Sequence, residues 1–86
     1  MPRFFTRLVN TTIDCEDDGL EFATAEEAGD AAVLSALDLA KDLLASGERL
    51  PQIEVIVSDD TGVVQRRLLT VSVAAVDHDG SSLFRH

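Results

Sequence analysis

The chain has few of the residues on which easily recognised functional sites depend. Cys15 is the single cysteine, which excludes an intrachain disulfide and any zinc site built from several cysteines. Lysine and arginine together number 7, against 16 aspartate and glutamate residues, so the formal net charge is −9. This shortage of cations argues against direct binding of nucleic acid and against a polybasic membrane anchor.

The sequence also lacks a long apolar run. A secretory signal needs about 7–15 consecutive apolar residues and a membrane-spanning helix about 20. Here Thr6, Arg7 and Asn10 interrupt the apolar residues near the start. We therefore expect a cytoplasmic protein without a membrane segment. With 86 residues, 45% of them apolar, and only five glycines and two prolines, the chain suits one small folded domain.

The pattern of apolar residues and turn formers predicts an α+β fold of the order β-β-α-β-β. One helix packs on a four-stranded, mostly antiparallel sheet formed within residues 1–76, and the polar residues 77–86 form a flexible tail. The second strand is expected to be short and irregular, with a polar loop or a bulged segment over residues 14–19. The expected elements are strands at 3–9, 13–22, 52–58 and 63–73, a helix from about 25 to 46, and a turn at 59–62.

The helix carries the clearest local signals. Thr24 and Glu27 have the spacing of a capping box, and Gly47 suits a left-handed C-terminal stop. Its apolar stripe is dominated by alanine, which allows the helix backbone to approach the sheet closely. Gly29 lies within this stripe, where it either packs closely against a bulky strand residue or is simply tolerated. Leu34 falls on the opposite, polar side.

One helix covers only one face of a sheet, so the other face is either wet or covered by a partner. Ile56 is expected on this second face, and the last strand has apolar residues of both parities, Val64 and Leu68 against Leu69 and Val71. A second copy of the chain would supply the missing cover, so we predict a homodimer. The candidate interface residues are Leu34, Ile56, Leu69 and Val71.

The acidic segment between the first two strands resembles the opening of a calcium loop. Asp14, Glu16 and Asp18 alternate ahead of Gly19, as calcium ligands do, and are weak metal candidates. The loop's twelfth position requires a glutamate and is Ala25 here, so a solvated acidic turn is the better interpretation. Cys15 lies among these carboxylates, which weaken the nucleophilicity of a thiol.

No arrangement typical of an enzyme is present in the sequence. Serine, histidine and aspartate occur without the spacing of a triad, and there is no phosphate-binding loop or nucleophile elbow. We therefore expect no catalytic activity and no cofactor.

The charges are unevenly distributed. No lysine or arginine occurs between Leu8 and Ala40, and half of the acidic residues fall between Asp14 and Asp30. Arginines instead occur in the first strand and, as a pair, in the last one. If those two strands are neighbours, a small basic patch is expected on an otherwise acidic molecule.

Several segments resemble a family of short bacterial proteins, the domain of unknown function DUF6894. These are Met1-Pro2-Arg3-Phe4-Phe5, the acidic-Gly-Leu-Glu-Phe segment 17–22, the Ala/Glu/Leu helix 25–44, and Ile53-Glu54-Val55 leading through 59–62 into Val63-Val64. The resemblance covers the chain to about Val73 and implies a stand-alone β-β-α-β-β domain. It carries no catalytic residue over, and Thr6-Arg7 stands where the family often has an aromatic residue followed by histidine.

Together these observations favour a small interaction or regulatory domain that acts through a protein-binding surface. An alternative is an antitoxin-like or inhibitor protein whose acidic surface blocks a basic partner. A third, supported only by the acidic segment, is a calcium- or ligand-binding module.

Overall fold

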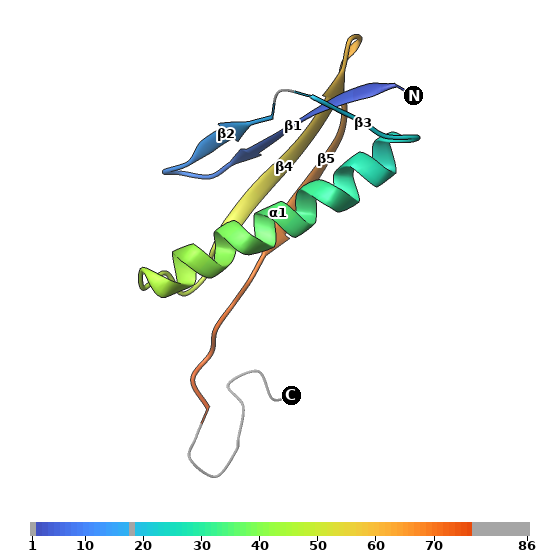
Figure 1. The fold of residues 1–86 in the computed structure, drawn as a ribbon. Coiled ribbons are helices and arrows are strands. Elements are labelled where there is room, and N and C mark those ends of the chain that lie inside the picture. Colours follow the sequence, from blue (N-terminus) through green and yellow to red (C-terminus); the bar gives the residue numbers. More distant parts are fainter. Residues whose placement is uncertain (1, 18, 77–86) are drawn as a thin grey trace.

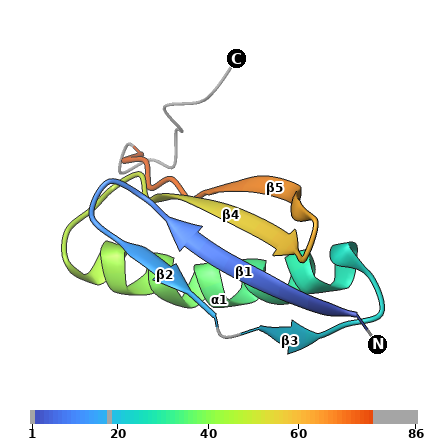
Figure 2. The same ribbon diagram turned by 90° about the horizontal axis from the view of Figure 1, so that it is seen from above.

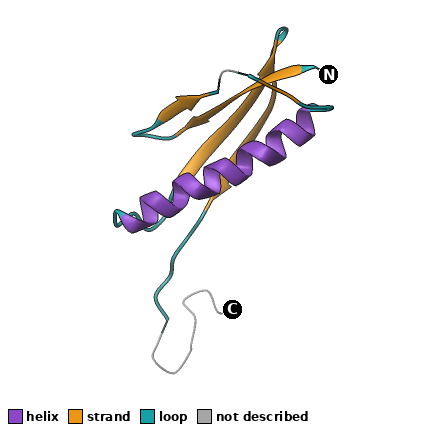
Figure 3. Ribbon diagram, in the orientation of Figure 1, coloured by secondary structure: helices purple, strands orange, loops and turns teal. Residues whose placement is uncertain are grey.

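The computed structural model describes residues 2–17 and 19–76, so the expected flexible tail at 77–86 lies outside the described residues. Figure 1 and Figure 3 show a sheet with a single long helix running along it. In chain order the elements are β1 (Arg3–Val9), β2 (Asp14–Glu16), β3 (Leu20–Glu21), α1 (Ala25–Ala45), β4 (Gln52–Asp59) and β5 (Gly62–Thr70).

The strands form one antiparallel sheet in the order β2-β1-β4-β5, and β3 also pairs with β1. Helix α1 lies on one side of this sheet, whereas the opposite side is not covered by any described element (Figure 2). The expected α+β fold is therefore confirmed. The irregular second strand is divided into β2 and β3.

The structure decides between the polar loop and the bulged segment expected at residues 14–19, because this segment begins as a strand. Asp14–Glu16 pairs with Arg7–Val9, and the Asp17 amide donates to the Thr6 carbonyl at 2.9 Å. Cross-strand pairing stabilises this polar segment in an extended form that its composition alone does not favour.

The ends of α1 follow the sequence signals. The Thr24 hydroxyl accepts the Glu27 amide hydrogen at 3.1 Å, as the capping box requires. The Glu27 carboxylate accepts from the Ala23 amide at 3.1 Å, one residue before the amide that the motif predicts. The helix ends at Ala45, and Gly47 follows with a φ of 105°, a conformation that favours glycine.

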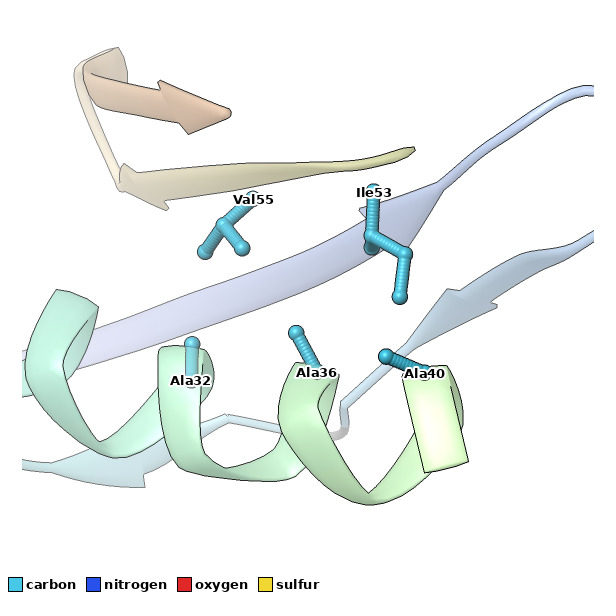
Figure 4. Packing of buried hydrophobic residues seen from close by; sticks show 5 residues of the cluster. All are labelled: Ala32, Ala36, Ala40, Ile53 and Val55. Atoms are coloured by element: carbon cyan, nitrogen blue, oxygen red, sulfur yellow. The ribbon is translucent and has the colours of Figure 1, made fainter. Parts of the chain in front are cut away.

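The main core is a contact between a stripe of small helix residues and branched residues of β4. Ala32, Ala36 and Ala40 of α1 face Ile53 and Val55, and all five side chains are buried (Figure 4). Because alanine has only a methyl group, the helix backbone lies close to the sheet. A smaller cluster, formed by Phe4, Ala28 and Val57, extends the core toward the start of the helix.

Gly29 marks the closest approach of α1 to β5. A Cβ atom there would lie 2.2 Å from the Gln65 Oε1 and 2.9 Å from the Arg67 Cζ. Of the two alternatives for Gly29, close packing is confirmed, although the neighbours are long polar side chains. The Arg67 guanidinium extends to Asp30 on the next helix position, at 2.7 Å. This ion pair links β5 to α1.

The β4–β5 hairpin decides which residues of β5 face the helix. Its turn is closed by Asp59, whose carboxylate accepts from the Thr61 amide at 2.8 Å, and Gly62 follows with a φ of 123°. The register shifts between Val57 and Ser58, as in a β-bulge. After this shift, Gln65 lies opposite Val57 and every alternate residue from there faces the helix.

Within residues 2–17 and 19–76, α1 is the only long helix, and it is not apolar enough over its length to cross a membrane.

The core contact predicts that two large apolar side chains contribute very different amounts to the free energy of unfolding. Ile53→Ala should lower the free energy of unfolding by about 2–5 kcal/mol, because the side chain is 1% exposed and its removal leaves a cavity. Leu34→Ala is the control, since Leu34 is 66% exposed and its removal should change the free energy by less than about 0.5 kcal/mol. Urea denaturation followed by circular dichroism measures both. Equal losses in the two variants would contradict this core.

Candidate functional site

The side of the sheet that faces away from α1, here called the open face, is the candidate functional site. Two adjacent transverse rows lie at its centre. In one row Ile56 lies between Arg7 and Arg66, and in the next Glu54 lies between Val9 and Leu68. Ile56 and Val9 are half-buried, whereas Leu68 is 64% exposed. Both a middle strand and the β5 edge therefore expose apolar surface here.

The two arginines at the centre of the open face, Arg7 and Arg66, are each paired with a carboxylate of a neighbouring strand. Arg7 of β1 donates from Nε to Asp14 of β2 at 2.8 Å and from a terminal nitrogen to the second oxygen. Arg66 of β5 lies 3.2 Å from the Glu54 carboxylate of β4. The hydrogen bond from Arg7 lowers the pKa of the Asp14 carboxyl, and the same pair raises the pKa of Arg7.

The basic patch considered from the sequence does not form, because β4 lies between β1 and β5. Arg67 alternates to the helix-covered side, where it pairs with Asp30, and Arg7 and Arg66 are each matched by an acid. The centre of the open face is therefore close to electrically neutral, in a chain whose net charge is −9.

A groove of about 420 Å³ lies at one end of the open face. It is formed where the ends of β1 and β5 meet the segment that precedes β4. The apolar part of its lining comprises Val9, Leu50 and Leu68, and Glu48 and Glu54 contribute carboxylates. Leu50 and Leu68 are 52% and 64% exposed, so the groove joins two large apolar side chains that the domain itself leaves uncovered.

The acidic metal candidates are not brought together as a cation site. Asp14 is paired with Arg7, and Glu16 lies beside it in β2, opposite Arg7. Asp18 lies outside the described residues. Among residues 2–17 and 19–76, no group of three or more His, Cys, Asp or Glu side chains is arranged to hold a metal ion.

Two small hollows lie on the other side of the sheet, between β1 and α1, with volumes of about 50 and 70 Å³. Both are lined by Thr6, Asp17, Ala32 and Ser35, and the second also by Cys15. Sites for small molecules usually measure about 300–1,000 Å³, so neither hollow accommodates a cofactor-sized molecule.

The four predicted interface residues are distributed over three surfaces. Ile56 is on the open face, as expected. Leu34 is exposed on the outer side of α1. Leu69 and Val71 pack against the helix-covered core instead, because Leu69 lies opposite the buried Ile53.

Sequence reasoning did not select Leu68 as an interface residue, nor Val9 and Leu50 of the groove. The last strand has apolar residues at both even and odd positions, so the sequence indicated apolar side chains on both of its sides. Which of them face away from the helix depends on the register of the hairpin.

The exposed apolar side chains outnumber the buried ones. Among the large apolar residues of the described segments 2–17 and 19–76, only Phe4, Ile53, Val55 and Val57 are buried. The exposed set of the described residues has three members in β5 and two in the residues after it, and consists of Leu20, Leu34, Leu37, Leu50, Val63, Val64, Leu68, Val73 and Val76. Scattered exposed leucines are ordinary on a protein surface, whereas a contiguous exposed apolar patch is common at sites of protein–protein contact.

A comparison with known protein families gives one match. The model of the family described as Domain of unknown function (DUF6894) matches residues 3–74. The chain belongs to the DUF6894 family. The match spans all six elements of the sheet-and-helix fold, from Arg3 of β1 to beyond the end of β5. No curated protein and no solved structure matches the chain.

The ion pair on the open face predicts a pKa that depends on one arginine. The Asp14 carboxyl should titrate below the ordinary aspartate value of about 3.9, and Arg7→Gln should return its pKa toward that value. Because the folded-state pKa is depressed, the stabilisation from Asp14 is present above the unfolded-state pKa. It is lost as the pH falls through the folded-state value. Carbon-detected NMR titration of the carboxyl groups measures this.

Asp59 supplies the internal control for this titration. Its pKa is lowered by hydrogen bonds from Thr61, not by an arginine, so Arg7→Gln should leave its titration unchanged. An equal shift of both carboxyls in the variant, or no shift of Asp14, would contradict the pairing.

Proposed function

We propose that this domain is a protein-interaction module whose binding surface is formed by the open face and β5. The observation that supports this most directly is the imbalance between buried and exposed large apolar side chains. The helix covers one side of the sheet, and the apolar residues of β5 and of the groove have no cover from the described part of the chain. A partner that buries them would complete the core.

The pairing of the arginines suits such a surface. A buried, uncompensated charge opposes association, whereas Arg7 and Arg66 are matched by Asp14 and Glu54 within the same chain. Ile56 and Leu68 therefore lie among charges that already have their partners. In this proposal the domain acts by binding and has no catalytic role.

The first partner that we propose is a second copy of the chain. A homodimer buries two copies of the same apolar strand at once, as an isologous interface does. The surface near the start of α1 favours a second function, in which the domain blocks a basic protein. Glu21 and Glu26 are exposed there, and no cation lies in the sequence between Leu8 and Ala40.

Two leucines of nearly equal exposure test whether the surface at β5 is used. Leu68 is 64% exposed in β5, and Leu34 is 66% exposed on the outer side of α1. Sedimentation equilibrium over micromolar to millimolar concentrations should show a dimer. Leu68→Asp should raise its dissociation constant at least about tenfold, because it buries an unpaired carboxylate.

Leu34→Asp is the matched control and should leave the dissociation constant unchanged. A chain that stays monomeric at every concentration contradicts self-association. Equal effects of the two substitutions contradict the location of the surface.

A further inference from the structure

The sheet has two edges of very different character. At one edge β2 is three residues long and acidic, with Asp14 and Glu16 in it. At the other edge β5 is nine residues long, and hydrogen bonds from Val71 to Pro51 and from Val73 to Arg49 continue its pairing beyond Thr70. A long edge strand presents a row of backbone groups on which another strand can pair.

Charge selects which of the two edges a second copy can approach. Residues 61–76 contain no aspartate or glutamate, although the chain has 16 of them. The two arginines of β5 are held by Glu54 on the open face and by Asp30 on the helix side. Two copies of a chain with a net charge of −9 therefore repel least along β5, whereas two β2 edges would bring carboxylates together.

The backbone of β5 determines which residues would pair across such an edge. Val71 donates inward to Pro51, and Leu69 lies opposite Ile53 in the same register. Hydrogen-bonded and non-hydrogen-bonded pairs alternate in an antiparallel ladder, so the odd-numbered residues from Arg67 to Val73 direct their backbone groups toward β4. The even-numbered residues Arg66, Leu68 and Thr70 direct theirs outward, and their side chains lie on the open face.

Two-fold symmetry then limits the register. When two identical strands pair about an axis perpendicular to the sheet, the residue on the axis faces itself. Arg66 or Arg67 on the axis would place two guanidinium groups directly opposite each other, which is destabilising. Leu68 on the axis places an exposed leucine against its counterpart, and Arg66 faces Thr70 of the partner subunit.

We propose that two copies of this domain pair through their β5 edges, antiparallel and with Leu68 on the two-fold axis, to form one continuous sheet. This inference rests on the proposed function and names its partner and geometry. Leu68 and its counterpart exchange both backbone hydrogen bonds, since the N–H and C=O of Leu68 point outward. The two open faces lie on the same side of the joined sheet, and Leu68 and its counterpart meet where they join.

Spin labels along β5 test the register. In a Cys15→Ser background, a nitroxide is attached at Arg66→Cys, Leu68→Cys or Thr70→Cys, and dipolar broadening gives the distance between the labels of a dimer. With Leu68 on the axis, position 68 gives the shortest distance. Positions 66 and 70 give equal, longer distances. At each of them the two labels of a dimer are offset by four residues along the strands, or about 13 Å of backbone.

The comparison of positions 66 and 70 decides the matter even if a label at 68 weakens the dimer. If Leu69 lies on the axis instead, the two copies of residue 66 are offset by about 20 Å along the strands and the two copies of residue 70 by about 7 Å. If Arg67 lies on the axis, the offset is about 7 Å at position 66 and about 20 Å at position 70. Either unequal result, in a chain that sediments as a dimer, overturns the proposed register. Absence of broadening at all three positions of a dimer overturns pairing through β5. A chain that sediments only as a monomer contradicts the proposed self-association itself.

Discussion

The structure depends on the close contact between a single helix and one side of the sheet. Ala32, Ala36 and Ala40 bring the backbone of α1 near Ile53 and Val55, so few atoms on the helix suffice to bury the middle strand. Gly29 extends this approach to β5, where a side chain of any size would meet Gln65 and Arg67. Because one helix covers only one face, this packing also fixes which half of the sheet is left without cover.

The open face has properties that a solvent-exposed side of a sheet does not need. Apolar side chains remain on it at Ile56 and Leu68, and the arginines that lie among them are neutralised by carboxylates of neighbouring strands. The long edge at β5 carries no acidic residue, in contrast to β2. Membership of the DUF6894 family places this arrangement in a group defined by its sequence and not by an activity. The proposed interaction role therefore rests on the surface itself.

The sequence predicted the features that depend on local chemistry. Thr24, Glu27 and Gly47 indicated the ends of α1, and the alternation of Ile53, Val55 and Val57 gave the buried side of β4. It could not predict features that depend on the register and order of strands. The shift at Val57 and Ser58 turns Leu69 toward the core and leaves Leu68 outside, and the insertion of β4 between β1 and β5 prevents a basic patch. Each depends on pairing between segments far apart in the chain, for which a strand's own composition carries no signal.

Amide hydrogen exchange along β5, followed by NMR at several protein concentrations, tests most directly whether a second copy completes the sheet. In dilute solution the inward-pointing amides of Arg67 and Leu69 should exchange slowly and those of Leu68 and Thr70 rapidly, because only the former bond to β4. Raising the concentration should protect Leu68 and Thr70 as well and remove the alternation. Rapid exchange of Leu68 and Thr70 at every concentration, with Arg67 and Leu69 protected throughout, would contradict the account.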